Sequence, residues 1–142
     1  MRINLKIEDL NGVKRITQVF HVKYKRGAII KFIIDTGCPF SQISEIDIQR
    51  MGIPITRSYH DKIASGLGGS IINLKEINKD VELLYENKLK TKVLHLAYSP
   101  SPSPKSITRV SLLGTDFLIE QRFKLVVDFS NNNTYLERED IN

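Results

Sequence analysis

The sequence predicts a mostly-β domain with two short helices. Polar and apolar residues alternate with period two near the N-terminus, and residues 28–34 form a run of apolar and β-branched residues. Only two segments carry helix start and stop signals. A chain of 142 residues has the length of one domain, so we expect residues 1–142 to form a single domain around one core.

Strand and turn signals follow one another along the chain. We expect strands at 2–7 and 16–22 to form a hairpin, with Asn11-Gly12 as its turn. A second turn at 25–27 leads into the strand 28–34, whose near-continuous apolar character predicts burial on both faces. Further strands are expected at 60–66, 70–78, 80–86, 89–98, 123–129 and 133–139.

The two helices are expected at 44–52 and 114–122. Ser44 is a good N-cap residue, and Gly52 is a typical residue for ending a helix. The repeat of serine and proline at 99–104 is expected to lie in an exposed loop, because proline cannot donate to a sheet. An exposed loop is favoured over a ligand for a proline-recognition domain.

Composition and charge exclude several classes of function. The net charge is +5, but the basic residues are spread along the chain and are not interleaved with aromatic residues, so no nucleic-acid partner is expected. No apolar segment has the length of a signal peptide or a membrane span, which predicts a cytoplasmic protein that does not bind a membrane. The single cysteine, Cys38, excludes an internal disulfide and fits a reducing compartment.

Metal, cofactor and nucleophile signals are weak. The residues His21, His60 and His95 lack ligand spacing, so neither a metal site nor a cofactor is expected. The chain has no G-x-S-x-G motif for a serine nucleophile. Cys38 is expected to be a small packing residue, because the negative charge of Asp35 disfavours a thiolate beside it.

Asp35-Thr36-Gly37 follows directly after the apolar strand. These three residues could form an ordinary turn, since aspartate and glycine are common turn residues. Their context is more specific: the segment "DTGCPFSQISEIDIQRMGIP" continues with Cys38, Ser41 and a short helix. This segment resembles the catalytic loop of the retropepsin family, the single-domain relatives of pepsin and the retroviral proteases.

Two further segments are similar to the same family. The segment "SLLGTDFLIEQRFKLVVDF" resembles its second signature, in which two apolar residues and a glycine precede a helix and lie beside the catalytic loop. Asp116 and Asp128 within it are otherwise expected to be a carboxylate in the first turn of a helix and a residue at the end of a strand. The segment "ASGLGGSI" is similar to the glycine-rich tip of the family's flap, and its glycines tolerate positive φ. A plain turn is the alternative interpretation.

The resemblance implies a closed, β-barrel-like acid-protease fold and an aspartic endopeptidase that acts on peptide or protein substrates. It implies that Asp35 is the catalytic carboxylate, that Thr36 forms hydrogen bonds across a twofold axis, and that the backbone N–H of Gly37 approaches the carboxylate. The residues implied at the substrate-binding flap are Gly66, Leu67, Gly68 and Gly69. Cys38 and Pro39 depart from the commonest pattern of the family.

The reaction requires two carboxylates, one ionised and one protonated. The chain carries one Asp-Thr-Gly, so the second carboxylate is expected from a second copy in a homodimer. The alternatives are a catalytically inactive retropepsin-like module that dimerises or binds peptides, and a basic β-domain that binds nucleic acid.

Overall fold

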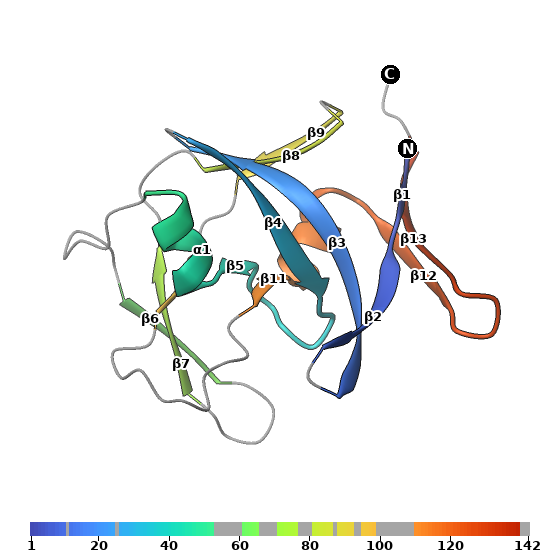
Figure 1. Ribbon diagram of the computed structural model, residues 1–142, viewed down its shortest axis with the longest axis horizontal. Helices are drawn as coiled ribbons and strands as arrows, with labels where there is room; N and C mark the ends of the chain where they lie inside the picture. The colour runs from blue at the N-terminus through green and yellow to red at the C-terminus, as the bar shows by residue number, and fades with distance from the viewer. Residues whose placement is uncertain are drawn as a thin grey trace.

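The computed structural model describes residues 1–10, 12–24, 26–52, 61–65, 71–76, 81–86, 88–92, 95–98 and 110–139. Within these ranges the chain forms thirteen strands and two short helices, which confirms the predicted mostly-β domain (Figure 1). The strands before the first helix are β1 (Arg2–Asn4), β2 (Lys6–Leu10), β3 (Val13–Lys23), β4 (Gly27–Ile34) and β5 (Gln42–Ile43). The remaining elements are α1 (Glu45–Arg50), β6 (Asp61–Ser65), β7 (Ile71–Glu76), β8 (Glu82–Tyr85), β9 (Leu89–Lys92), β10 (His95–Tyr98), β11 (Ser111–Leu113), α2 (Thr115–Glu120), β12 (Lys124–Asp128) and β13 (Asn133–Glu137).

The strands form two sheets. The large sheet has the order β6-β7-β10-β5-β11-β4-β3-β8-β9, with β2 paired to β3, and the small sheet has the order β1-β13-β12. Figure 1 shows the small sheet beside the long β3–β4 hairpin, with the N-terminus at one end of the sheet. In the described part of the chain both sheets are open, so the barrel-like closure implied by the family resemblance stays a prediction.

The predicted hairpin at the N-terminus forms, but its first strand is shifted. Strand β2 pairs with β3 across the turn, with Leu10 opposite Val13, and Gly12 adopts a φ of 81° that suits glycine. Residues 2–4 instead form β1, which pairs with β13 and places Ile3 opposite Leu136. Because both of these side chains are fully buried, this pairing closes the N-terminus onto the C-terminal hairpin.

Strand β4 is buried on both faces only toward its end, where Phe32, Ile33 and Ile34 are buried in succession. In its first half Ile30 is buried, but its neighbours Ile29, which is 65% exposed, and Lys31 are not. The prediction of burial on both faces along the whole strand is therefore wrong for its first half. Strand β11 pairs with β4 only at residues 32–34, so β4 is flanked by two strands only where it leads into Asp35.

The predicted single strand at 89–98 is divided into β9 and β10. Strand β9 pairs with β8, while β10 pairs antiparallel with β7 and parallel with β5. Strand β11 was expected only as an apolar segment before a helix, and the structure makes it a strand parallel to β4. The central position of β11 explains why this short segment is extended: its two neighbours, β4 and β5, bond to it from both sides.

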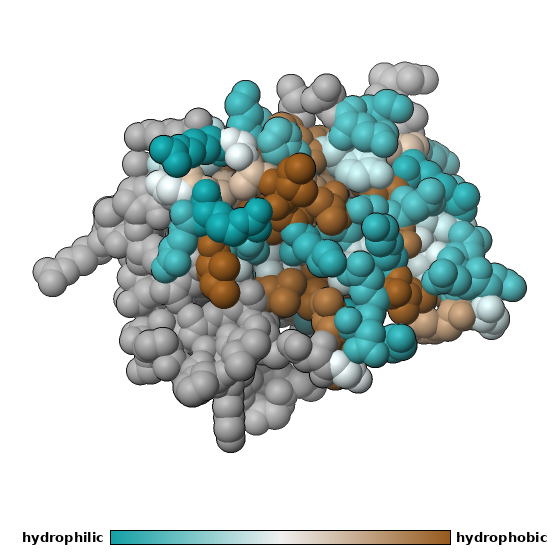
Figure 2. Space-filling view, viewed as in Figure 1, coloured by the Kyte–Doolittle hydropathy of each residue, from teal (hydrophilic) through white to brown (hydrophobic). Residues whose placement is uncertain are grey.

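Aromatic side chains hold the sheet against the second helix. Phe20 on β3 makes edge-to-face contacts with Phe32 on β4 and with Phe117 on α2, with ring centroids 5.8 and 6.3 Å apart. All three side chains are almost completely buried. Apolar side chains also reach the surface: on the face in Figure 2 they gather in the middle, with hydrophilic ones above them and to their right.

Both predicted helices are present. Ser44 is the N-cap of α1, and its side chain accepts a hydrogen bond from the backbone N–H of Asp47, as predicted. Gly52 follows α1 with a φ of 68°, which confirms it as the residue that ends the helix. Helix α2 begins after Gly114, which offers no capping side chain.

The aromatic contacts lead to a first prediction. Replacing Phe20 with alanine should lower the free energy of unfolding by about 3–5 kcal/mol, because a fully buried ring leaves a cavity among Phe32 and Phe117. Urea unfolding followed by circular dichroism measures this. The control Ile29→Ala removes a mostly exposed side chain and should change the value by less than about 0.5 kcal/mol. An equal loss in the two variants would contradict this account of the core.

Candidate active site

Asp35 lies at the end of β4 and is held through its backbone. Its N–H donates to the carbonyl oxygen of Leu113 at 2.9 Å, and its own carbonyl accepts from the N–H of Cys38 at 3.2 Å. The carboxylate is half-buried, and its Oδ1 accepts from the N–H of Gly37 at 2.9 Å. The expected approach of the Gly37 backbone to the carboxylate is therefore present.

The segment before α2 crosses directly behind this loop. Leu113 pairs with Ile34, and the N–H of Thr115 donates to the carbonyl of Cys38 at 2.9 Å. At Gly114, an added Cβ would lie 2.2 Å from the carbonyl oxygen of Cys38, and therefore only glycine permits this crossing. The predicted placement of the second apolar-glycine segment beside the Asp35 loop is confirmed.

Ser41 and Asp116 form a second connection between the two segments. The N–H of Ser41 donates to Oδ1 and Oδ2 of Asp116 at 3.0 and 2.9 Å, and the Ser41 hydroxyl donates to Oδ1 at 2.7 Å. The same hydroxyl accepts from the N–H of Gly114 at 3.0 Å. Asp116 therefore does more than the first-turn role expected of it, because it binds the far end of the Asp35 loop.

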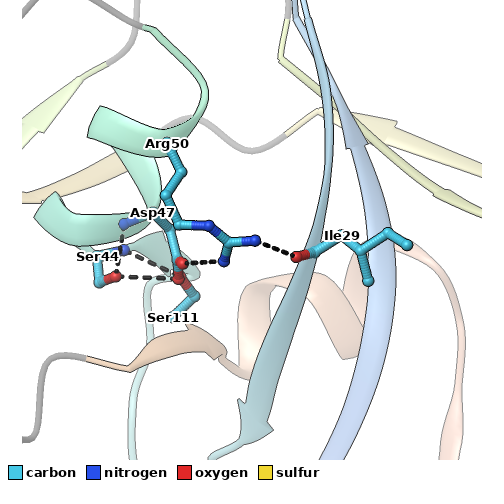
Figure 3. A network of polar contacts seen from close by, with 5 residues as sticks. All are labelled: Ile29, Ser44, Asp47, Arg50 and Ser111. Atoms are coloured by element: carbon cyan, nitrogen blue, oxygen red, sulfur yellow. Dashed lines mark hydrogen bonds and ion pairs between the residues drawn. The ribbon is translucent and has the colours of Figure 1, made fainter.

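A third polar network fixes helix α1 behind the loop (Figure 3). The carboxylate of Asp47 accepts from the hydroxyls of Ser111 and Ser44 at 2.7 and 3.0 Å, and the N–H of Ser44 donates to the Ser111 hydroxyl. Arg50 donates to Asp47 at 3.2 Å and to the carbonyl of Ile29 at 3.3 Å. These contacts join α1 to β11 and β4. Sequence analysis did not identify Asp47 or Ser111, because nothing in the sequence indicates which distant residues they meet.

The thiol of Cys38 is enclosed by the loop. It is half-buried and donates to the carbonyl of Phe40 at 3.1 Å. Burial raises the pKa of the thiol, and the nearby carboxylates of Asp35 and Asp116 raise it further. The thiol is therefore neutral around pH 7, which agrees with the expected packing role.

Of the other predicted site residues, the structure describes Thr36 but not the flap residues. Thr36 is exposed, and its hydroxyl has no hydrogen-bond partner in the described residues. The predicted flap residues Gly66, Leu67, Gly68 and Gly69 lie outside the described residues. Within the described ranges, no group of three or more histidine, cysteine, aspartate or glutamate side chains could hold a metal ion. In the same ranges, none of the helices is long and apolar enough to cross a membrane.

This arrangement is the fold of the retropepsin-like aspartic proteases. The chain is similar to a retropepsin-like aspartic protease from Rickettsia conorii, with a TM-score of 0.58 and 20% sequence identity. The match covers 96% of this chain and 90% of that protein. It is also similar to the EIAV protease, solved in complex with the inhibitor HBY-793, with a TM-score of 0.53 and 22% sequence identity. This match covers 83% of this chain and 98% of that protein. No protein-family model and no curated protein sequence matches the chain.

The close approach at Gly114 leads to a second prediction. Gly114→Ala should destabilise the fold by about 1–3 kcal/mol, because the Cβ must displace the backbone of Cys38. Thermal unfolding measures the change. Gly27→Ala is the matched control, since its Cβ would meet only the end of the exposed His21 side chain. A Gly114→Ala protein as stable as the wild type would show that the crossing tolerates a side chain.

A double-mutant cycle tests the Ser41–Asp116 connection. Ser41→Ala and Asp116→Ala each remove the hydroxyl–carboxylate bond, so their effects on the free energy of unfolding should not add, with a coupling of about 0.5–3 kcal/mol. Ser130→Ala paired with Asp116→Ala is the control, because Ser130 bonds to Asp128 instead. Additive effects of Ser41→Ala and Asp116→Ala would contradict a direct connection.

Proposed function

We propose that this chain is an aspartic endopeptidase and that residues 1–142 are one protease domain. The single observation that carries this proposal is the position of Asp35: a half-buried carboxylate at the end of a buried strand, with its backbone fixed by the crossing segment. The fold shared with the aspartic proteases from Rickettsia conorii and EIAV supports the same reaction class. Fold alone does not determine chemistry, so the proposal rests on this carboxylate.

The proposed active unit is a homodimer with Asp35 of both copies at the twofold axis. The ionised carboxylate takes a proton from water as the water oxygen attacks the peptide carbonyl carbon, and the protonated carboxylate gives its proton to the carbonyl oxygen. The tetrahedral species then breaks its C–N bond: the leaving nitrogen takes the proton of the protonated carboxyl group, and one hydroxyl of the tetrahedral species gives its proton to the ionised carboxylate, which restores the starting dyad. One chain supplies one Asp-Thr-Gly, so the second carboxylate comes from the other copy.

The neighbouring residues take supporting roles in this proposal. The N–H of Gly37 donates to Oδ1 of Asp35 and orients the carboxylate. The exposed Thr36 takes the role of bonding with the second copy beneath the dyad. The segment Gly66, Leu67, Gly68 and Gly69 closes over the bound peptide and excludes water.

The proposal is tested by substitution at Asp35. Asp35→Asn should reduce peptide cleavage by a factor on the order of 10²–10⁴ or more, because it removes general acid–base catalysis. Glu86→Gln makes the same change of charge at an exposed residue in the β8–β9 turn and should keep full activity. Cleavage is followed by mass spectrometry of a peptide mixture. Equal activity of Asp35→Asn and wild type would remove Asp35 from the mechanism.

A mixing experiment tests the shared dyad. When wild-type and Asp35→Asn chains are refolded together at one to one, about a quarter of the dimers carry two wild-type chains, so activity per dimer should fall to about a quarter. Active sites contained within single chains would leave about half. Retention near half would therefore contradict the homodimeric site.

A further inference from the structure

A hollow of about 180 Å³ lies directly beside Asp35. Its apolar walls come from β2, β3, the end of β4 and Phe129, the residue after β12. Its polar lining includes Asp35 and two cations, Lys14 and Arg15. Phe129 is 71% exposed although it is aromatic. An exposed apolar surface next to a candidate catalytic carboxylate is typical of a place where a ligand is bound.

The register of the strands explains why the two cations lie here. Thr17 on β3 is opposite Ile33 on β4, so two residues further along Arg15 lies level with Asp35. Strand β4 ends at Ile34, whereas β3 continues to Val13 as the partner of β2. The extension of β3 therefore carries Lys14 and Arg15 past the end of β4 and beside the Asp35 loop.

The two acidic side chains of strand β2 beside these cations, Glu8 and Asp9, do not neutralise them. Glu8 lies directly opposite Arg15, but its carboxylate accepts from the Thr17 hydroxyl at 2.7 Å and pairs with Lys31 at 2.9 Å. Within the described residues Arg15 forms no ion pair. Lys14 lies 3.7 Å from the carboxylate of Asp9, and both side chains are more than half exposed, so this pair is weak.

We propose that this hollow binds an acidic side chain of the substrate close to the cleaved bond, with Lys14 and Arg15 as specificity-determining residues. The apolar walls contact the methylene groups of a glutamate, and the cations at the rim pair with its carboxylate. This inference rests on the proposed function and narrows the substrate class to peptides with an acidic residue beside the scissile bond. The net charge of +5 acts in the same direction, since it attracts acidic peptides.

The experiment compares pairs of cleaved peptides that differ only in glutamate or glutamine within two residues of the cleaved bond. The wild type should cleave the glutamate peptide with a kcat/KM about three- to fivefold higher, the range of an exposed ion pair, and the difference should shrink at high salt. In the variant Lys14→Gln with Arg15→Gln the ratio should fall to about one. Arg15→Lys keeps the charge and should keep most of the preference.

Lys88→Gln is the matched control. It removes one positive charge at an exposed position in the β8–β9 turn and should leave the ratio unchanged. A wild type without preference, a preference that survives the double substitution, or an equal loss in Lys88→Gln would each overturn the proposal. The last two outcomes would assign any preference to another site or to net charge.

A binding measurement separates this inference from the proposed function. If the wild type cleaves no peptide, the protease proposal fails, and the hollow is then tested with fluorescent apolar hexapeptides that carry one central glutamate or glutamine. Fluorescence anisotropy with the intact chain should give tighter binding of the glutamate peptide in the wild type and equal binding in the double variant. Equal binding of the two peptides to the wild type would overturn the proposal independently of activity.

Discussion

The structure depends on the crossing of two backbone segments behind Asp35. Two hydrogen bonds, from Asp35 to Leu113 and from Thr115 to Cys38, join a loop near residue 36 to a segment almost eighty residues later. Backbone groups buried at such a crossing must be paired, and here each segment satisfies the other. The absence of a side chain at Gly114 is the condition for this approach, so one glycine determines how the candidate carboxylate is held.

Two carboxylates then convert this crossing into a rigid support. Asp116 binds the backbone and hydroxyl of Ser41, and Asp47 binds the hydroxyls of Ser44 and Ser111. Asp116 accepts three hydrogen bonds from Ser41, and Asp47 accepts one from the distant Ser111 besides the local bond from Ser44. Charge-assisted bonds of this kind are stronger than neutral ones. Asp35 differs from both, because the carboxylate bond found for it is local, from Gly37. Of these three carboxylates, Asp35 is the one that accepts no hydrogen bond from a distant segment in the described residues.

Local signals in the sequence predicted much of this arrangement. The caps of α1, the β2–β3 hairpin with Gly12 in its turn and the strand before Asp35 follow from residues close in sequence, and the structure confirms them. The partner of β1, the division at 89–98 and the contacts of Asp47 depend on residues far apart, which periodicity and turn signals do not specify. The family resemblance supplied one such long-range contact, the segment beside the Asp35 loop. It could not supply the extension of β3 that brings Lys14 and Arg15 to the hollow, because that follows from the register of this chain.

The central claim is that two chains build one active site around two copies of Asp35. Titration calorimetry with a tight-binding statine-type peptide, whose hydroxyl mimics the tetrahedral species, measures the number of sites per chain directly. The account predicts saturation at one inhibitor for every two chains, and no binding to Asp35→Asn at the same concentrations. Saturation at one inhibitor per chain would contradict the shared site.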